Sequence, residues 1–241
     1  MPGRTSWPGT EPLKKGHARP NGGIAYLLKF APKEAYIDDL MDGRLYMNAA
    51  GYYHGLPGEQ GDPLEASMAP GACLHGYTCL PIYCIYTVRE NDIVDNNVKI
   101  PIRMIQEFGC VDGWIGIVQY DSFERLADRH IDGGGSIYAH GPISNGVPVP
   151  KLNREIFEGI PHNLVIKTPK YAYQREHRII GAQPVECRLM PDEKHPGCKI
   201  EEYDHAKLDL DSSLTDYSWK VSVSSLEKTQ DGLMLKLPHR V

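Results

Sequence analysis

One continuous apolar segment does most to limit how this chain can fold. Leu80-Pro81-Ile82-Tyr83-Cys84-Ile85-Tyr86-Thr87-Val88 consists mostly of β-branched and aromatic residues and shows no polar alternation. Such a run is typical of a strand that is covered on both faces. Pro81 must then lie at the start of the strand, because proline cannot donate a hydrogen bond inside a sheet. The segment therefore predicts a central strand with packed layers on both sides.

The other ordered segments are short and do not alternate regularly between strand and helix. This pattern, and the absence of Gly-x-Gly-x-x-Gly, argue against a Rossmann domain and favour a strand-rich α+β fold with few short helices. We expect the helix after Pro32 to end at Gly43, and Asp121 or Ser122 to cap a helix over 123–127. The remaining expected strands are 24–30, 44–48, 114–120 and 137–140, and a further short helix is expected at 101–108.

The chain divides into three parts by composition. Residues 1–22 are rich in Pro, Gly, Lys and Arg and predict a flexible basic tail. Residues 23–186 form the expected core. Residues 187–241 predict antiparallel strands added to the same domain, at 199–203, 219–223 and 233–237, with Asp231-Gly232 as a hairpin turn between the last two.

Bulk properties exclude several classes of protein. The net charge of −5 gives no global field that would attract nucleic acid, although a local basic patch would still serve. There is no apolar run long enough to span a membrane and no secretory signal, so we expect a cytoplasmic protein. The six cysteines show no Cys-x-x-Cys, and their spacing with histidines matches no closed zinc pattern, so we expect no metal site.

A segment near the three-quarter point carries the strongest functional signal. Tyr171-Ala172-Tyr173-Gln174-Arg175-Glu176-His177 lies between two expected strands. If the segment is extended, Gln174 and Glu176 project from the same face. An amide beside a carboxylate, flanked by tyrosines, suits a site that holds a polar ligand and stabilises positive charge. The alternative is a surface turn in which Glu176 forms an ion pair with Arg178 or Arg175.

Three segments occur in a characteristic order: Tyr26–Phe30 followed by Ile37–Gly43, then Leu80–Cys84, and finally Gln174-Arg175-Glu176. Together they resemble the mono-ADP-ribosyltransferase superfamily, in particular DNA-targeting ADP-ribosyltransferase toxins and phage-defence or prophage relatives. The resemblance covers roughly residues 24–186. The chain departs from the family pattern in carrying Lys29 where many relatives have His or Arg, and in lacking a Ser-Thr-Ser stretch.

The resemblance implies split mixed or antiparallel sheets, NAD as substrate, and a nucleic acid or protein as acceptor, with a cognate antitoxin as a further partner. Glu176 would stabilise the oxocarbenium-like ribose, and Gln174 would orient the acceptor nucleophile. Tyr173 or Tyr83 would pack against nicotinamide, and Lys29 would contact the ribose or a phosphate. The structural alternatives are core packing for Tyr83 and a solvated strand edge for Lys29.

Two other functions compete with this one. The first is a non-catalytic module that binds nucleic acid or nucleotide through the basic tail and cationic side chains near the Gln174 segment. The second is a metal-dependent hydrolase that uses Asp62, Glu65 and a histidine. The cations of the first alternative are Lys167, Lys170, Arg175 and Arg178.

Overall fold

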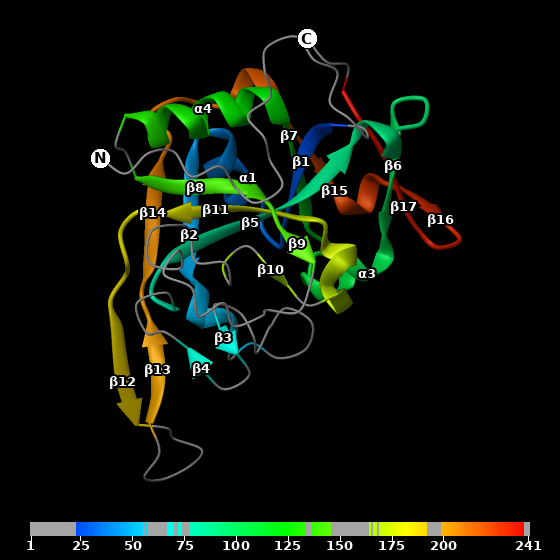
Figure 1. The fold of residues 1–241 in the computed structure, drawn as a ribbon. Coiled ribbons are helices and arrows are strands. Elements are labelled where there is room, and N and C mark those ends of the chain that lie inside the picture. The colour runs from blue at the N-terminus through cyan, green and yellow to red at the C-terminus, as the bar shows by residue number, and fades with distance from the viewer. Residues whose placement is uncertain are drawn as a thin grey trace.

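A computed structural model describes residues 23–54, 56, 67–69, 72–73, 78–133, 136–145, 164, 166–167, 169–191 and 199–238. The expected tail at residues 1–22 and the side chains of Asp62 and Glu65 lie outside these ranges. The fold is strand-rich, with antiparallel sheets and few helices, as expected for the α+β class (Figure 1). Within the described ranges, every helix is too short or too polar to span a lipid bilayer.

The main sheet is antiparallel at every pairing and is built around β5. The strand order is β14-β2-β5-β1-β7-β15, and β11 joins β5 to β8. Its strands are β1 (Ile24–Ala31), β2 (Arg44–Ala49), β5 (Pro81–Arg89), β7 (Trp114–Gln119), β8 (Ile137–Pro142), β11 (Glu176–Gly181), β14 (His205–Asp209) and β15 (Ser218–Ser222).

One edge of β5 is shared by two strands that do not meet. β1 pairs with the end of β5, where Leu28 lies opposite Tyr86. β2 pairs with its beginning, where Asn48 lies opposite Ile82. Between these two points, no strand in the described chain pairs with residues 83–85 on this edge. The sheet is therefore split beside the middle of β5, while β11 pairs with the opposite edge through the same stretch.

Helices and further strands cover both faces of the sheet, as the apolar character of β5 predicts. On one face, α1 (Glu34–Met41) and α4 (Tyr120–Asp132) contribute Leu40 and Phe123 to a core that contains Leu27 and Ile179. On the other face, α3 (Ile102–Glu107) packs with a small sheet against alternating side chains of β1. This small sheet consists of β6 (Asn97–Pro101), β16 (Glu227–Thr229) and β17 (Gly232–Lys236).

Two helix boundaries test the sequence rules. Gly43 follows α1 with φ +82°, in the left-handed region that favours glycine, as predicted. The prediction that Asp121 or Ser122 caps the next helix is wrong. α4 begins at Tyr120, directly after β7, and its N-cap residue Gln119 makes no side-chain capping bond. The helix starts where the strand ends, so both expected caps lie inside its first turn.

The C-terminal strands join the molecule at separate places. β14 pairs with β2, and β15 pairs with β7, so both extend the main sheet. Asp231-Gly232 does form a hairpin turn, but the expectation that it follows strand 219–223 is wrong. The turn joins β16 to β17, because β15 is already paired with β7. A separate hairpin of β12 (Cys187–Pro191) and β13 (Lys199–Tyr203) projects from the body (Figure 1).

The remaining described elements are small. Two-stranded pairs are formed by β3 (Ser67–Ala69) with β4 (Ala72–Cys73), and by β9 (Ser144–Asn145) with β10 (Ile166–Lys167). The second of these pairs is parallel. The described 3₁₀ segments are η1 (Ala50–His54), η3 (Glu90–Asp92), η6 (Pro169–Gln174), η7 (Thr215–Tyr217) and η8 (Val223–Ser225).

Candidate functional site

The segment that carries Gln174 and Glu176 is a turn and not an extended strand. η6 runs up to Gln174, Arg175 has φ +39°, and β11 begins at Glu176. The carbonyl of Arg175 accepts hydrogen bonds from the backbone N–H and the hydroxyl of Thr87, at 2.9 and 2.8 Å. The prediction that the two side chains share one face of a strand is therefore wrong. They are brought together instead by Lys167.

Glu176 lies in a buried cluster of charges. Arg178 donates to its Oε1 from Nε at 2.7 Å and from Nη2 at 2.6 Å, and the Lys167 ammonium lies 2.6 Å from Oε2. Lys167 also donates to Oε1 of Gln174 at 3.0 Å, and Arg178 donates to the carbonyl of Leu164 at 2.7 Å. Glu176 thus forms the expected ion pair with Arg178, whereas Arg175 pairs with Asp92.

The ionisation of Glu176 follows from these contacts. Burial alone would raise the pKa of its carboxyl group, since the charged form loses water. The neighbouring Arg178 and Lys167 outweigh this effect and hold the pKa of Glu176 well below its usual range. The Cys84 thiol also hydrogen-bonds the carboxylate, and burial together with Glu176 raises the pKa of Cys84 to about 12. The site therefore holds a fixed anion beside a protonated thiol.

Lys29 lies in the gap beside β5. Its ammonium donates to the carbonyl of Cys84 at 2.9 Å and stands 4.1 Å from the centroid of the Tyr83 ring. Lys29 thus supplies a hydrogen bond that a neighbouring strand would otherwise make. Burial lowers the pKa of Lys29, and the nearby Cys84 and Glu176 partly oppose this shift. Lys29 and Glu176 therefore approach the same stretch of β5 from different strands.

The two tyrosines occupy opposite faces of the sheet. Tyr83 is buried in the core under α4, and this burial raises its pKa. Tyr173 packs against the other core, where its hydroxyl bonds to Glu107 and the Arg103 guanidinium stands 3.9 Å from its ring centroid. Gln174 donates to the Tyr173 hydroxyl at 3.3 Å. The structure therefore joins Gln174 to Glu176 through Lys167 and brings Lys29 to the carbonyl of Cys84. Tyr83 lies on the α4 face of the sheet, opposite Glu176, and Tyr173 lies at the margin of the cluster.

Sequence reasoning missed two members of this cluster. The sequence places Cys84 only inside the buried segment 80–88, but in the structure it lies opposite Arg178 in the ladder and contacts Glu176. Tyr53 lies close enough to Cys84, Glu176 and Arg178 to interact with them electrostatically, and its side chain hydrogen-bonds Asn48. The only sequence signal for Tyr53 is its place at the start of a glycine-rich loop.

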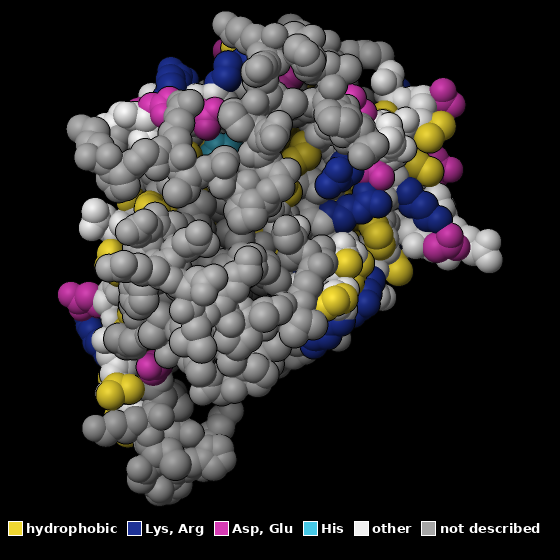
Figure 2. All heavy atoms as spheres, viewed as in Figure 1, with side chains coloured by type: hydrophobic (Ala, Val, Ile, Leu, Met, Phe, Trp, Pro, Cys, Tyr) yellow, Lys and Arg dark blue, Asp and Glu magenta, His cyan; other side chains and the backbone are white. Residues whose placement is uncertain are grey.

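The cations proposed for phosphate binding are mostly engaged. Arg178 and Lys167 are buried around Glu176, and Arg175 pairs with Asp92. Figure 2 shows Lys and Arg side chains gathered over the part of the molecule that holds α3, η6 and β6. There, Lys99 pairs with Asp231 and Arg103 with Glu107. Much of the basic character of this side is therefore neutralised locally.

Two further observations limit the chemistry. Among the described residues, no three His, Cys, Asp or Glu side chains are grouped as metal ligands. A surface hollow is lined by Arg125, Asp128 and Arg129 of α4. That helix covers the sheet face opposite Glu176, so the hollow does not open onto the cluster. In comparisons with known proteins, the chain matches no family model, no curated protein and no solved structure.

Proposed function

We propose that this protein is an NAD-dependent mono-ADP-ribosyltransferase that modifies a nucleic acid or protein acceptor. The observation that supports this best is that Lys29 and Glu176, from separate strands, both contact Cys84 in the middle of β5, and that Gln174 is joined to Glu176 through Lys167. The family resemblance assigns these three residues, Lys29, Gln174 and Glu176, together with Tyr173 or Tyr83, to NAD and its acceptor.

The chemistry requires a fixed negative charge. When the nicotinamide–ribose bond breaks, the electron pair leaves with neutral nicotinamide and the ribose carbon becomes cationic. The acceptor nucleophile then bonds to that carbon and releases its proton. Glu176 stays ionised in a buried setting, where a charge stabilises an opposite charge far better than in water. Arg178 and Lys167 hold its two oxygens in place.

The bound state requires one exchange of hydrogen bonds. A ribose hydroxyl is a stronger donor than a thiol and would replace Cys84 on the Glu176 carboxylate, while both cations stay in place. Gln174 accepts a hydrogen bond from Lys167 through its carbonyl oxygen and donates from its amide group to the Tyr173 hydroxyl at 3.3 Å. In the bound state this amide group would orient the acceptor. Lys29 would contact a ribose hydroxyl or a phosphate oxygen.

The test uses NAD labelled in either half of the molecule. The purified protein is incubated with single-stranded DNA, RNA and a protein extract in separate reactions, and both nicotinamide release and label transfer from the ADP-ribose half are measured. We expect release with one acceptor class and a loss of about 100-fold in Glu176→Gln, the scale for removing one electrostatic contact to a transition state. Gln174→Ala should reduce transfer more than release.

Arg44→Ala is the matched control, because Arg44 lies on the surface away from the cluster. Circular dichroism and thermal melting verify that each variant is folded. Equal release by wild type and a folded Glu176→Gln variant would contradict the proposal, as would a folded wild type that neither binds NAD in calorimetry nor releases nicotinamide. Salt-dependent nucleic-acid binding that survives Glu176→Gln, without NAD turnover, would identify the non-catalytic module instead.

A further inference from the structure

Two cysteine thiols meet at the base of the β12–β13 hairpin. Cys79 lies just before β5, and Cys187 is the first residue of β12, far along the chain. The Cys187 thiol is within hydrogen-bonding reach of the Cys79 thiol and of the Tyr203 hydroxyl. Both cysteines are free. The contact lies outside the Glu176 cluster and is independent of the proposed function.

The surrounding backbone holds the two thiols in place. Val185 donates its N–H to the carbonyl of Cys79 at 2.8 Å, which fixes the chain two residues before Cys187. On the other strand of the hairpin, Tyr203 lies opposite Cys187 and bonds to Thr78. Its ring packs so closely on Gly51 that a Cβ there would lie 2.3 Å from it. The cysteines are therefore kept together by contacts on both sides of the pair.

We propose that Cys79 and Cys187 are a thiol–disulfide modification site, which becomes a disulfide on reaction with an oxidised low-molecular-weight disulfide such as glutathione disulfide. The thiols are within hydrogen-bonding reach, and the contacts on both sides of the pair hold the two chain segments side by side while the sulfurs close to a bond of about 2.05 Å. Cys187 is half-buried, whereas Cys79 is 6% exposed. The reagent therefore meets Cys187 first.

The reaction proceeds in two exchanges. The Cys187 thiolate attacks one sulfur of glutathione disulfide, forming a mixed disulfide and releasing one glutathione. The Cys79 thiolate then attacks the Cys187 sulfur and releases the second glutathione. The two cysteine protons end on the two reduced glutathiones, so the protein pair is oxidised and the reagent is reduced.

The surroundings of Cys187 determine how the rate of the reaction depends on pH. Burial and the Glu201 carboxylate raise the pKa of the Cys187 thiol, so little thiolate is present at neutral pH. The rate should therefore increase as the pH rises toward 9. The product ties the projecting hairpin to the residues that precede Tyr83 and Cys84 on β5.

The experiment uses the full chain, with glutathione disulfide as the probe at pH 8. Remaining thiols are alkylated, and an unreduced digest is analysed by mass spectrometry. We expect a Cys79–Cys187 cross-linked peptide and a melting temperature that rises by several degrees, because a long loop is closed in the unfolded chain. A thiol reductant should reverse both changes.

Two variants sharpen the result. Cys187→Ser should abolish the cross-link and the shift in melting temperature. Cys110→Ser should retain both, because the Cys110 thiol donates to the carbonyl of Phe108 in a different core. A lasting Cys187–glutathione adduct, a Cys187–Cys198 bond, or unmodified thiols in the folded wild type would each overturn the proposal.

Discussion

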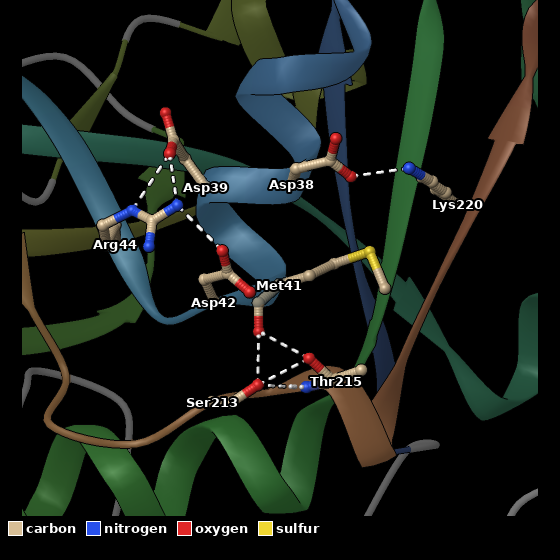
Figure 3. A network of polar contacts seen from close by, with 8 residues as sticks. All are labelled: Asp38, Asp39, Met41, Asp42, Arg44, Ser213, Thr215 and Lys220. Atoms are coloured by element: carbon tan, nitrogen blue, oxygen red, sulfur yellow. Dashed lines mark hydrogen bonds and ion pairs between the residues drawn. The ribbon is translucent and has the colours of Figure 1, made fainter.

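Two regions of the molecule use ion pairs of similar length in opposite surroundings. In the cluster at the split sheet, Arg178 lies 2.6 Å from Glu176, and their side chains are 0% and 7% exposed. At the end of α1, Arg44 lies 2.8 Å from Asp39, and those side chains are 52% and 47% exposed (Figure 3). The two ion pairs have similar lengths but contribute differently to stability, because water screens the exposed pair and not the buried one.

The α1 region is held mainly by its backbone. The carbonyl of Met41, at the end of the helix, accepts a hydrogen bond from the N–H of Leu214 at 2.7 Å. It also accepts one from the hydroxyl of Ser213 at 3.1 Å (Figure 3). These bonds satisfy a carbonyl that the helix itself leaves unpaired. They also dock the segment after β14 against α1. The contact between α1 and this segment therefore rests on the hydrogen bonds to the Met41 carbonyl and not on the charged side chains nearby.

The largest effect is expected from Arg178→Met. The substitution leaves Glu176 buried with only one cation and removes the donor to the Leu164 carbonyl. We expect a loss of about 3–5 kcal/mol in the free energy of unfolding, measured by urea denaturation. The double variant Glu176→Leu with Arg178→Met should be more stable than the sum of the two single losses predicts. Additive losses would show that the two charges are not coupled.

A smaller loss is expected from Gly43→Ala. The residue has φ +82°, and an added Cβ would lie 2.3 Å from the carbonyl oxygen of Ser212. Left-handed strain costs roughly 1–3 kcal/mol, and the contact adds to it. Gly109→Ala is the matched control, since Gly109 has φ +62° but nothing within 4 Å of its Cβ position. Equal losses in the two variants would show that the close approach to Ser212 contributes nothing.

The next effect is a dependence on acid pH that comes from His177. Burial and the adjacent His140 ring hold the pKa of His177 well below its usual range, and Glu176 only partly opposes them. Below about pH 6.5, His177 therefore binds a proton in the unfolded chain but not in the folded chain. Stability is full above about pH 6.5 and falls below it, by up to about 1.4 kcal/mol per pH unit.

Urea denaturation between pH 5 and 7 measures this slope. The groups that face His177 are His140, which in turn contacts Asp128, and the rings of Tyr120 and Phe123. His177→Leu should reduce the slope by about one proton, while Glu176 stays ionised throughout this range. An unchanged slope would assign the pH dependence to other histidines.

The smallest effect is expected from Arg44→Ala. Its ion pairs with Asp39 and Asp42 are half exposed, so their loss should change the melting temperature less than Gly43→Ala does. Raising the salt concentration should reduce even this difference, since salt screens exposed charges. If Arg44→Ala lowered the free energy of unfolding as much as Arg178→Met does, the exposed and the buried ion pairs would contribute equally to stability, which would contradict this account.

Local patterns predicted the elements of this fold better than their partners. The central strand with Pro81 at its start and the helix that ends at Gly43 follow from apolar patterning and backbone rules. The strand that precedes the Asp231-Gly232 turn was predicted wrongly. Strand β15 pairs with β7, which is distant in sequence, and so leaves β16 to pair with β17.

The sequence indicated some members of the buried charge cluster but not its geometry. The sequence indicates Gln174 and Glu176 as a pair, yet they meet through the ammonium of Lys167 and not on the face of a strand. That Arg178 is wholly buried depends on its register opposite Cys84 and on contact with Leu164. Both contacts are made with residues distant in sequence, so the residues around Arg178 do not distinguish it from an ordinary surface cation.

The most direct test of the central proposal is a crystal structure of the protein soaked with NAD. We predict that the nicotinamide-side ribose lies beside Cys84 of β5, with a hydroxyl about 2.6–3.2 Å from the Glu176 carboxylate and Lys29 against the same ligand. NAD bound elsewhere, with Cys84, Lys167 and Arg178 still enclosing Glu176, would contradict the account.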